Sequence, residues 1–336
     1  MAATSSPVRI FIKDLKPAQR IAGVYAVQNL QLGKTKTGGD YLKMVLADKS
    51  GRTPGRKWSS SGDEAASLPQ DGFVYIEGQS QAYQGEVQIV VDFIQPHTPS
   101  REEMAALLPC TTKNINEMFS QLRALLGSLT HPAVRSLADR YLEDGQLMEA
   151  FCMAPAATSL HHAFLGGLLE HTLGLMEMAE KILPFYPQVN RDIVLMGLFL
   201  HDVGKCQELS WENGFAYTTD GQLVGHIARG AIMLAEKAKA CQDAELGEGA
   251  MTVPAKILLA LTHIVLSHHE KPEFGAAKIP STPEAILVAH LDNMDAKMNM
   301  VLTAADRNNP KDGVAGEFTE KVWALETRIW RADPTK

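Results

Sequence analysis

A histidine and an aspartate stand side by side at the end of a long apolar run, and their side chains could bind a metal ion. His201 and Asp202 follow residues 193–200, which read IVLMGLFL. Neutral imidazole is a ligand for Zn, Mn, Fe, Co or Ni, and the two oxygens of one carboxylate can bridge two divalent ions. The pair also fits a buried histidine that an aspartate merely orients, because a two-residue motif is weak evidence by itself.

Histidine recurs at several other places after residue 160, mostly beside carboxylates or other histidines. These neighbouring residues favour the interpretation that His201 and Asp202 bind a metal ion. Along the chain the order is His, His-Asp, His, His-His and Asp, in the segments Glu170-His171, His201-Asp202, Gly225-His226, His268-His269 and Asp292. The series resembles the HD-domain metallophosphohydrolases, all-helical proteins in which several helices bring their ligands to one or two metal ions. The resemblance implies a metal-dependent phosphohydrolase domain in the second part of the chain.

We predict a set of ligands for one or two divalent ions from these segments. Asp202 is expected to bridge the ions, Asp292 to complete the first site, and His226 to bind a second ion. His268 and His269 can both be ligands only if their helix ends there, because neighbouring side chains on a helix point about 100° apart. The predicted ligands are His171, His201, Asp202, His226, His268, His269 and Asp292.

Cationic and polar residues near these ligands could contact a phosphate. Lys205 lies about one turn after Asp202 and could hold a phosphate oxygen or offset developing charge. We therefore predict Asp202 and Lys205 as catalytic residues. Arg229 and Lys297 are candidates for substrate contact, and His162 is expected at the substrate or behind the ligands.

Two adjacent glycines lie between the first histidines. His162, Gly166 and His171 are spaced near multiples of a helical turn, so we expect one helical face to run from His162 to His171. Glycine costs a helix about 1 kcal/mol relative to alanine. Gly166-Gly167 therefore suggests that a backbone or a ligand approaches closely at this point.

Residues 1–97 have the alternating pattern of β-structure. Five runs rich in Val, Ile and aromatic residues are separated by turn residues, at 19–30, 41–48, 52–58, 73–78 and 86–94. A glycine-centred hairpin at 83–85 precedes the last run. Five short strands with this hairpin resemble an OB-fold, a small Greek-key barrel that binds single-stranded nucleic acid.

The binding face of such a barrel would combine positive charge with aromatic rings on which bases stack. Each candidate taken singly also fits a solvated lysine or a core aromatic residue. The net charge of the chain is −7, but residues 1–100 contain eleven Lys or Arg against nine Asp or Glu, so the acidic excess lies in the remainder. The candidates for nucleic-acid contact are Lys34, Lys36, Lys43, Arg56, Lys57, Trp58 and Tyr83.

Length and composition predict two globular domains. The chain has 336 residues, of which 45% are hydrophobic, and this is enough for two cores. We expect an OB-fold domain at 1–97, a linker at 98–112, a helical HD domain at 113–312 and a C-terminal segment at 313–336 that packs on the HD domain. The N-terminus lacks the pattern of a signal peptide and no apolar run is long enough for a membrane span. The four cysteines lack C-x-x-C spacing, which predicts reduced thiols and a cytoplasmic protein.

Longer segments resemble one family of HD proteins, the bacterial YhaM family, in which an OB-fold also precedes the HD domain. The matching segments are HHAFLGGLLEHT at 161–172, HDVGK at 201–205, GHI at 225–227, LSHH at 266–269, DNMDAKMN at 292–299 and GEFTE at 316–320. The resemblance implies a cytoplasmic, manganese-dependent 3′-to-5′ exoribonuclease that releases nucleoside monophosphates, with single-stranded DNA as a second candidate substrate. Fe, Co, Ni and Mg are the alternative metals.

One residue departs from that family. Glu270 stands where the family is expected to have a small residue, and His268-His269-Glu270 is similar to the cyclic-dinucleotide phosphodiesterase branch of HD proteins. The Gly-Tyr-Pro signature of that branch is absent, because residues 274–280 read FGAAKIP. Glu270 therefore leaves the choice of substrate open between RNA and smaller nucleotides.

We formulate one mechanism and two alternatives. In the exonuclease hypothesis, ions bridged by Asp202 supply an activated water that attacks the terminal phosphodiester, and Lys205 offsets the charge on phosphorus. Alternatively, the chain is a phosphodiesterase of cyclic dinucleotides or small nucleotides, with a regulatory barrel. A third possibility is a single-strand-binding module with a non-catalytic HD domain, which metal removal would not affect. Residues 322–325 could support a homo-oligomer.

Overall fold

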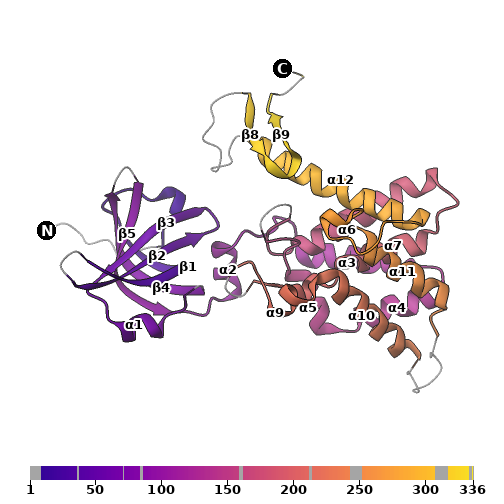
Figure 1. Ribbon diagram of the computed structural model, residues 1–336, viewed down its shortest axis with the longest axis horizontal. Helices are drawn as coiled ribbons and strands as arrows, with labels where there is room; N and C mark the ends of the chain where they lie inside the picture. The colour runs from indigo at the N-terminus through magenta and orange to yellow at the C-terminus, as the bar shows by residue number, and fades with distance from the viewer. Residues whose placement is uncertain are drawn as a thin grey trace. The chain divides into compact units, whose positions relative to one another are not determined.

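The chain folds into two compact units, which we describe separately (Figure 1). The first comprises Met1–Pro109 with Glu212–Gly214, and the second comprises Cys110–Trp211 and Phe215–Lys336. The computed structural model describes residues 9–35, 38–70, 72–83, 86–158, 162–211, 214–242, 252–306, 317–332 and 335. Within these residues no helix combines the length and the apolar character that crossing a membrane requires.

The first unit is a closed barrel of five strands. Neighbouring strands follow the order β1-β2-β3-β5-β4, and β3 and β5 are parallel whereas the other pairs are antiparallel. This Greek-key order confirms the predicted OB-fold. The strands are β1 (Arg20–Lys34), β2 (Asp40–Asp48), β3 (Gly51–Trp58), β4 (Gly72–Tyr83) and β5 (Glu86–Pro96), and the short helix α1 (Gly62–Ser67) lies between β3 and β4.

Alternation along the strands fills the barrel interior. On β2, Leu42, Met44 and Leu46 are buried while Lys43 points outward and is exposed, as the two-residue period of a strand requires. Strands β4 and β5 change register between Glu77 and Gly78. A Cβ at Gly78 would lie 2.3 Å from the carbonyl oxygen of Val90, so glycine permits the close approach at this bulge.

A short helix completes the barrel unit within the segment expected to be a linker. Helix α2 (Arg101–Leu107) begins with a capping box formed by Ser100 and Glu103. It contacts β1 and β2, and the carbonyl of Ala106 accepts a hydrogen bond of 3.3 Å from the backbone of Lys49. Part of the segment 98–112 therefore packs on the barrel as a helix.

The second unit is a bundle of helices around a central buried helix. Helix α7 (Arg191–Leu200) contacts α6, α11, α12, α4 and α3, and every residue from Ile193 to Leu200 is buried. A helix that is apolar on all sides is expected at the centre of a core. The other helices are α3 (Ile115–Gly127), α4 (Pro132–Leu142), α5 (Gly145–Met153), α6 (Gly167–Ile182), α8 (Lys205–Glu208), α9 (Thr219–Leu223), α10 (Gly225–Gln242), α11 (Ala255–Ser267) and α12 (Pro283–Ala305).

Two short hairpins interrupt this helical unit. Strands β6 (Leu209–Ser210) and β7 (Ala216–Tyr217) pair antiparallel, and β8 (Phe318–Val322) pairs with β9 (Thr327–Trp330). The second hairpin contacts α12, and Figure 1 shows it in yellow at the end of that helix. The bundle is therefore all-helical, whereas two short sheets flank it.

Candidate metal centre

The HD turn comes directly after the buried helix α7. His201 is the residue that ends α7, and Asp202, Val203 and Gly204 form a turn before α8. A Cβ at Gly204 would lie 2.1 Å from the carbonyl oxygen of His226. Glycine at this position therefore lets the first turn of α10 pack against the HD turn, and this contact brings His226 to Asp202.

The first ligand cluster combines three helices. His171 comes from α6, His201 from the end of α7 and Asp292 from α12, and their ligand atoms lie within 4.8 Å of one another. His171 Nε2 is 3.2 Å from Asp292 Oδ1 and 3.4 Å from His201 Nε2, while Asp202 Oδ2 is 3.4 Å from His201 Nε2. Two imidazole nitrogens and two carboxylates thus point at one place, as around a divalent ion.

The second ligand cluster uses the other oxygen of Asp202. His226, His268 and His269 surround it, with Asp202 Oδ1 lying 3.5 Å from His226 Nε2 and 3.6 Å from His268 Nε2. These three atoms are buried and have no hydrogen-bond partner among the described residues. Burying polar atoms without a partner is costly, and an ion ligated by all three accounts for their arrangement. The residues therefore fit a divalent metal, and Asp202 joins the two clusters.

Each histidine of this centre is oriented by a hydrogen bond from its other ring nitrogen. The Nδ1–H groups of His201, His268 and His269 donate to the carbonyls of Leu198, Val265 and Phe274, at 2.6, 2.9 and 2.7 Å. Because a carbonyl can only accept, Nε2 retains its lone pair for a metal ion. Helix α11 ends at Ser267. The condition for His268 and His269 to reach one site is therefore met.

Carboxylates orient the remaining two histidines. His171 Nδ1 donates to Asp295 Oδ2 at 2.7 Å, and His226 Nδ1 donates to Glu208 Oε1 at 3.0 Å. Glu208 was not among the residues predicted from the sequence. Its one signal was the position of a carboxylate about one turn after Lys205.

Burial and charge set the protonation of the centre. Burial lowers the pKa of Lys205, but the adjacent Asp202 carboxylate, 2.7 Å away, outweighs it and the pKa is raised. Burial raises the pKa of Asp202, but Lys205 and His201 hold it well below its usual value. Lys205 is therefore an ammonium beside the ionised carboxylate of Asp202.

The histidines of the two clusters differ in their pKa. Burial lowers the pKa of His171, but its hydrogen bonds to Asp292 and Asp295 outweigh burial and raise it to about 9. Burial and the neighbouring His268 lower the pKa of His269 to about 3. His269 is therefore neutral, whereas an ion at His171 would have to replace a proton, because metal-bound imidazole is neutral.

The expected helical face from His162 to His171 is wrong. Helix α6 begins at Gly167, after Gly166 with φ +79°, and His162 itself has φ +48°. The two histidines meet through a shared partner instead, because Asp295 Oδ2 also accepts a hydrogen bond of 2.9 Å from His162 Nε2. A Cβ at Gly167 would lie 2.1 Å from the carbonyl oxygen of His162, which confirms the predicted close backbone approach.

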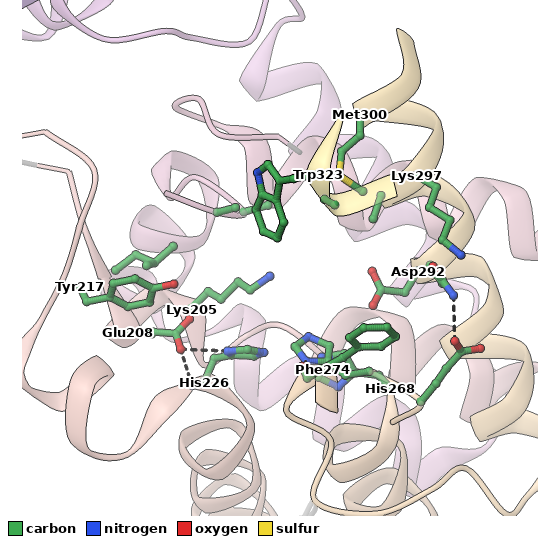
Figure 2. A pocket seen from close by; sticks show the side chains of 18 residues that line it. Lys205, Glu208, Tyr217, His226, His268, Phe274, Asp292, Lys297, Met300 and Trp323 are labelled. Carbon is green, nitrogen blue, oxygen red and sulfur yellow. Dashed lines mark hydrogen bonds and ion pairs between the residues drawn. The ribbon is translucent and has the colours of Figure 1, made fainter. Parts of the chain in front are cut away.

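A cavity of about 440 Å³ opens beside the second cluster (Figure 2). Lys205 and the predicted substrate contact Lys297 both line it. Arg229 does not line it, and its guanidinium pairs with Asp220. The cavity also has aromatic walls, which the sequence analysis did not predict.

On the barrel, some of the predicted nucleic-acid contacts gather and others do not. Trp58 is 46% exposed and packs on Tyr41 at 5.1 Å between ring centroids, and Tyr83 is 47% exposed. The Arg56 guanidinium lies 5.8 Å from the Tyr41 ring and 5.9 Å from the Tyr83 ring. Lys43 lies directly opposite Arg56 where strands β2 and β3 are hydrogen-bonded to each other. We call Tyr41, Lys43, Arg56, Trp58 and Tyr83 the barrel aromatic patch.

The other lysines lie apart from this patch or outside the described residues. Lys57 is largely buried against Glu64, with 3.0 Å between the charged atoms. Lys34 lies 3.8 Å from Asp40 at the end of β1. Lys36 is outside the described residues. Tyr41 is a member of the patch that the sequence analysis treated only as part of a strand.

The buried His-Asp turn and the converging helices define the HD class of metal-dependent phosphohydrolases, and residues 168–297 match the HD domain family. Over 303 residues the chain is 32% identical to the 3′-5′ exoribonuclease YhaM of Geobacillus sp. strain WCH70, covering 90% of this chain and 88% of that protein. It is 33% identical over 298 residues to the 3′-5′ exoribonuclease YhaM of Bacillus subtilis strain 168, covering 88% and 89%. The chain belongs to the YhaM family.

Among solved structures, the barrel is similar to the second OB-fold domain of replication protein A from Methanococcus maripaludis. That match has 22% identity and a TM-score of 0.22, and it covers 28% of this chain and 98% of that chain. The OB-fold assignment itself rests on the strand order of the barrel.

Proposed function

We propose that this chain is a metal-dependent 3′-to-5′ exoribonuclease that hydrolyses single-stranded RNA to nucleoside 5′-monophosphates. The observation that carries the proposal is a pair of ligand clusters that each approach one oxygen of Asp202, with the ammonium of Lys205 beside the same carboxylate. Its relatives are named as 3′-5′ exoribonucleases and align with nearly the whole chain. The direction of attack and the choice of RNA come from this relationship.

In the proposed reaction, the histidines and aspartates of the two clusters would bind metal ions, and Lys205 would bind the phosphate. His171, His201 and Asp292 would hold one ion, and His226, His268 and His269 the other, with Asp202 shared. When bound, such ions supply charge stabilisation to the phosphate and lower the pKa of a water molecule. Lys205 would contact a non-bridging phosphate oxygen and offset its charge.

The reaction consumes one water for each nucleotide released. The water oxygen bonds to phosphorus, and the bond from phosphorus to the preceding 3′-oxygen breaks. That oxygen takes up a proton and becomes the new 3′-hydroxyl end, while the released product is a nucleoside 5′-monophosphate. No side chain has to form a covalent bond with the substrate.

Manganese is the metal that we propose for this centre. Its donors are imidazole nitrogens and carboxylate oxygens without a thiolate, a set that suits Mn as well as Fe, Co or Ni. The family relationship favours manganese among them. The four cysteines form no disulfide, which is consistent with the cytoplasmic location included in this proposal.

The barrel aromatic patch would bind the upstream part of the strand. Trp58, Tyr41 and Tyr83 offer rings for stacking, and Arg56 and Lys43 offer positive charge for the phosphates. Stacking and phosphate contacts tolerate any base sequence. We therefore expect little sequence preference, and we include single-stranded DNA as a further substrate.

The test is a time course on single-stranded RNA labelled at its 5′ end, with manganese and separately with chelator. We expect a ladder that shortens from the 3′ end with manganese and intact RNA with chelator. RNA that stays intact under both conditions, together with turnover of cyclic dinucleotides or mononucleotides, would replace the exonuclease with a small-nucleotide phosphodiesterase. Shortening that chelator does not affect would exclude the metal centre from the chemistry.

A further inference from the structure

The cavity beside the metal centre has an exposed tryptophan in its wall. Trp323 is 73% exposed and lines the same cavity as Lys205, His268 and Asp292. Figure 2 shows its indole on the opposite side of the cavity from Phe274 and His268, with Lys205 and Asp292 between them. The ring makes no aromatic contact with any residue that the structure describes.

The C-terminal hairpin presents this indole at the cavity. Trp323 begins the turn Trp323–Leu325 between β8 and β9, and Glu326 closes the turn with φ +55° and a backbone hydrogen bond of 3.2 Å to the Trp323 carbonyl. The guanidinium of Arg328 donates to the Thr319 carbonyl at 2.9 Å and ties the two strands together. The hairpin contacts α12, which contributes Asp292 to the metal centre. The indole therefore belongs to an ordered element rather than to a loose end.

An exposed indole is poorly explained by folding alone. Tryptophan gains most when its large apolar area is removed from water, yet the hairpin leaves 73% of this residue accessible. The face that it offers is flat and aromatic, and nucleobases stack on such faces whatever their identity. The cavity volume of about 440 Å³ is within the range of small-molecule sites, about 300–1,000 Å³.

We propose that Trp323 is the stacking platform for the base of the 3′-terminal nucleotide. The inference rests on the proposed function, because it requires a scissile phosphate at Lys205 and the ligand clusters. A phosphate in that position places the terminal nucleoside in the same cavity, between the metal ligands and the indole. Stacking there fixes the end of the strand without selecting its sequence.

A matched pair of tryptophans allows a direct test. Trp330 lies on the same hairpin, is 49% exposed and does not line the cavity. The test compares kcat/KM of Trp323→Ala, Trp323→Phe and Trp330→Ala with that of the wild type under saturating manganese. Each is assayed on two RNAs that differ only at the 3′ end, one with a normal terminal nucleotide and one whose terminal nucleotide lacks its base.

The two RNAs separate stacking from other effects of the substitution. Base stacking corresponds to about a 5- to 150-fold change in binding, so Trp323→Ala should lower kcat/KM on normal RNA by a factor in this range. Removal of the terminal base should lower kcat/KM of the wild type similarly and leave Trp323→Ala nearly unchanged. Trp323→Phe should recover most of the loss, and Trp330→Ala should behave as the wild type.

The outcomes separate this inference from the proposed function. If the wild type shortens RNA but Trp323→Ala and Trp330→Ala have the same kcat/KM, the stacking role is refuted while the exonuclease stands. If Trp323→Ala loses activity equally on both RNAs, the indole acts in some way other than stacking, and the inference is again refuted. If the wild type shortens no RNA with manganese, the proposed function fails first.

Discussion

Replacing Glu208 by glutamine tests whether this residue orients the proposed metal ligand His226. Glu208 Oε1 accepts hydrogen bonds from the backbone N–H and the Nδ1–H of His226, both at 3.0 Å. Burial raises the pKa of Glu208, but the bonds from His226 outweigh it and the pKa is lowered, so the carboxylate is ionised. This pair of bonds directs His226 Nε2 toward Asp202 Oδ1, 3.5 Å away.

The size of the effect follows from the change in charge. A hydrogen bond to a charged group contributes about 1.5–3 kcal/mol, and one between neutral groups about 0.5–1.5 kcal/mol. Glutamine can still accept, so each of the two bonds should weaken by about 1 kcal/mol. The total of about 2 kcal/mol corresponds to about 30-fold in the manganese concentration for half-maximal activity, within the range of about 10- to 100-fold for partners behind metal ligands.

The assay measures the rate of RNA shortening against manganese concentration. Glu270→Gln is the matched control, because Glu270 lines the same cavity and contacts His290 Nδ1 at 2.7 Å, while His290 belongs to neither ligand cluster. We expect the half-maximal concentration to rise about 30-fold in Glu208→Gln and to stay at the wild-type value in Glu270→Gln. Equal shifts in both variants, or no shift in Glu208→Gln, would refute the orienting role of Glu208.

Four further substitutions test the two units separately. Asp202→Asn should abolish turnover, and manganese should no longer raise the melting temperature of this variant. The variant should retain most of its affinity for RNA, because RNA binding would reside largely in the barrel. A parallel loss of RNA affinity would contradict this division between the two units. In that inactive background, Trp58→Ala or Tyr83→Ala should weaken single-stranded RNA binding by about 1–3 kcal/mol each in fluorescence anisotropy, and unchanged affinity would place the binding surface elsewhere. Gly204→Ala puts a Cβ 2.1 Å from the His226 carbonyl oxygen. The free energy of unfolding in urea should therefore fall by about 1–3 kcal/mol. If the variant is as stable as the wild type, helix α10 moves away at little cost.

Residue patterns in the sequence predicted both folds, and they also predicted which residues could form the candidate metal centre. Alternation in residues 1–97 predicted the strands of the barrel, because a strand that is buried on one face repeats every two residues. The apolar run 193–200 ends in two predicted ligands, and the structure buries every residue of that run. The structure brings the predicted ligands into two clusters, with Asp202 in one of them and 3.4 Å from His201 of the other. These ligands are His171, His201, Asp202, His226, His268, His269 and Asp292.

The predicted helical face from His162 to His171 was wrong, because the spacing of residues carries no information on the backbone conformation of the residues between them. The spacing of His162 and His171 fits a helix. However, Gly166 adopts a φ of +79°, and helix α6 begins only after it, at Gly167. Both histidines still reach Asp295, because a helix distant in sequence supplies the shared carboxylate. The two histidines therefore lie close together through a shared partner and not through the predicted helical face.

Long-range packing determines which side chains face one another across the helices and hairpins. Nothing local in the sequence connects Glu208 with His226, Arg56 with Tyr41, or Trp323 with Lys205, since each pair is separated by a turn or by whole elements. Ligand types are encoded residue by residue, because a metal centre needs imidazole and carboxylate wherever they occur in the chain. The orientation of those ligands and the aromatic wall of the cavity depend on long-range packing, which brings together atoms that the linear order keeps apart.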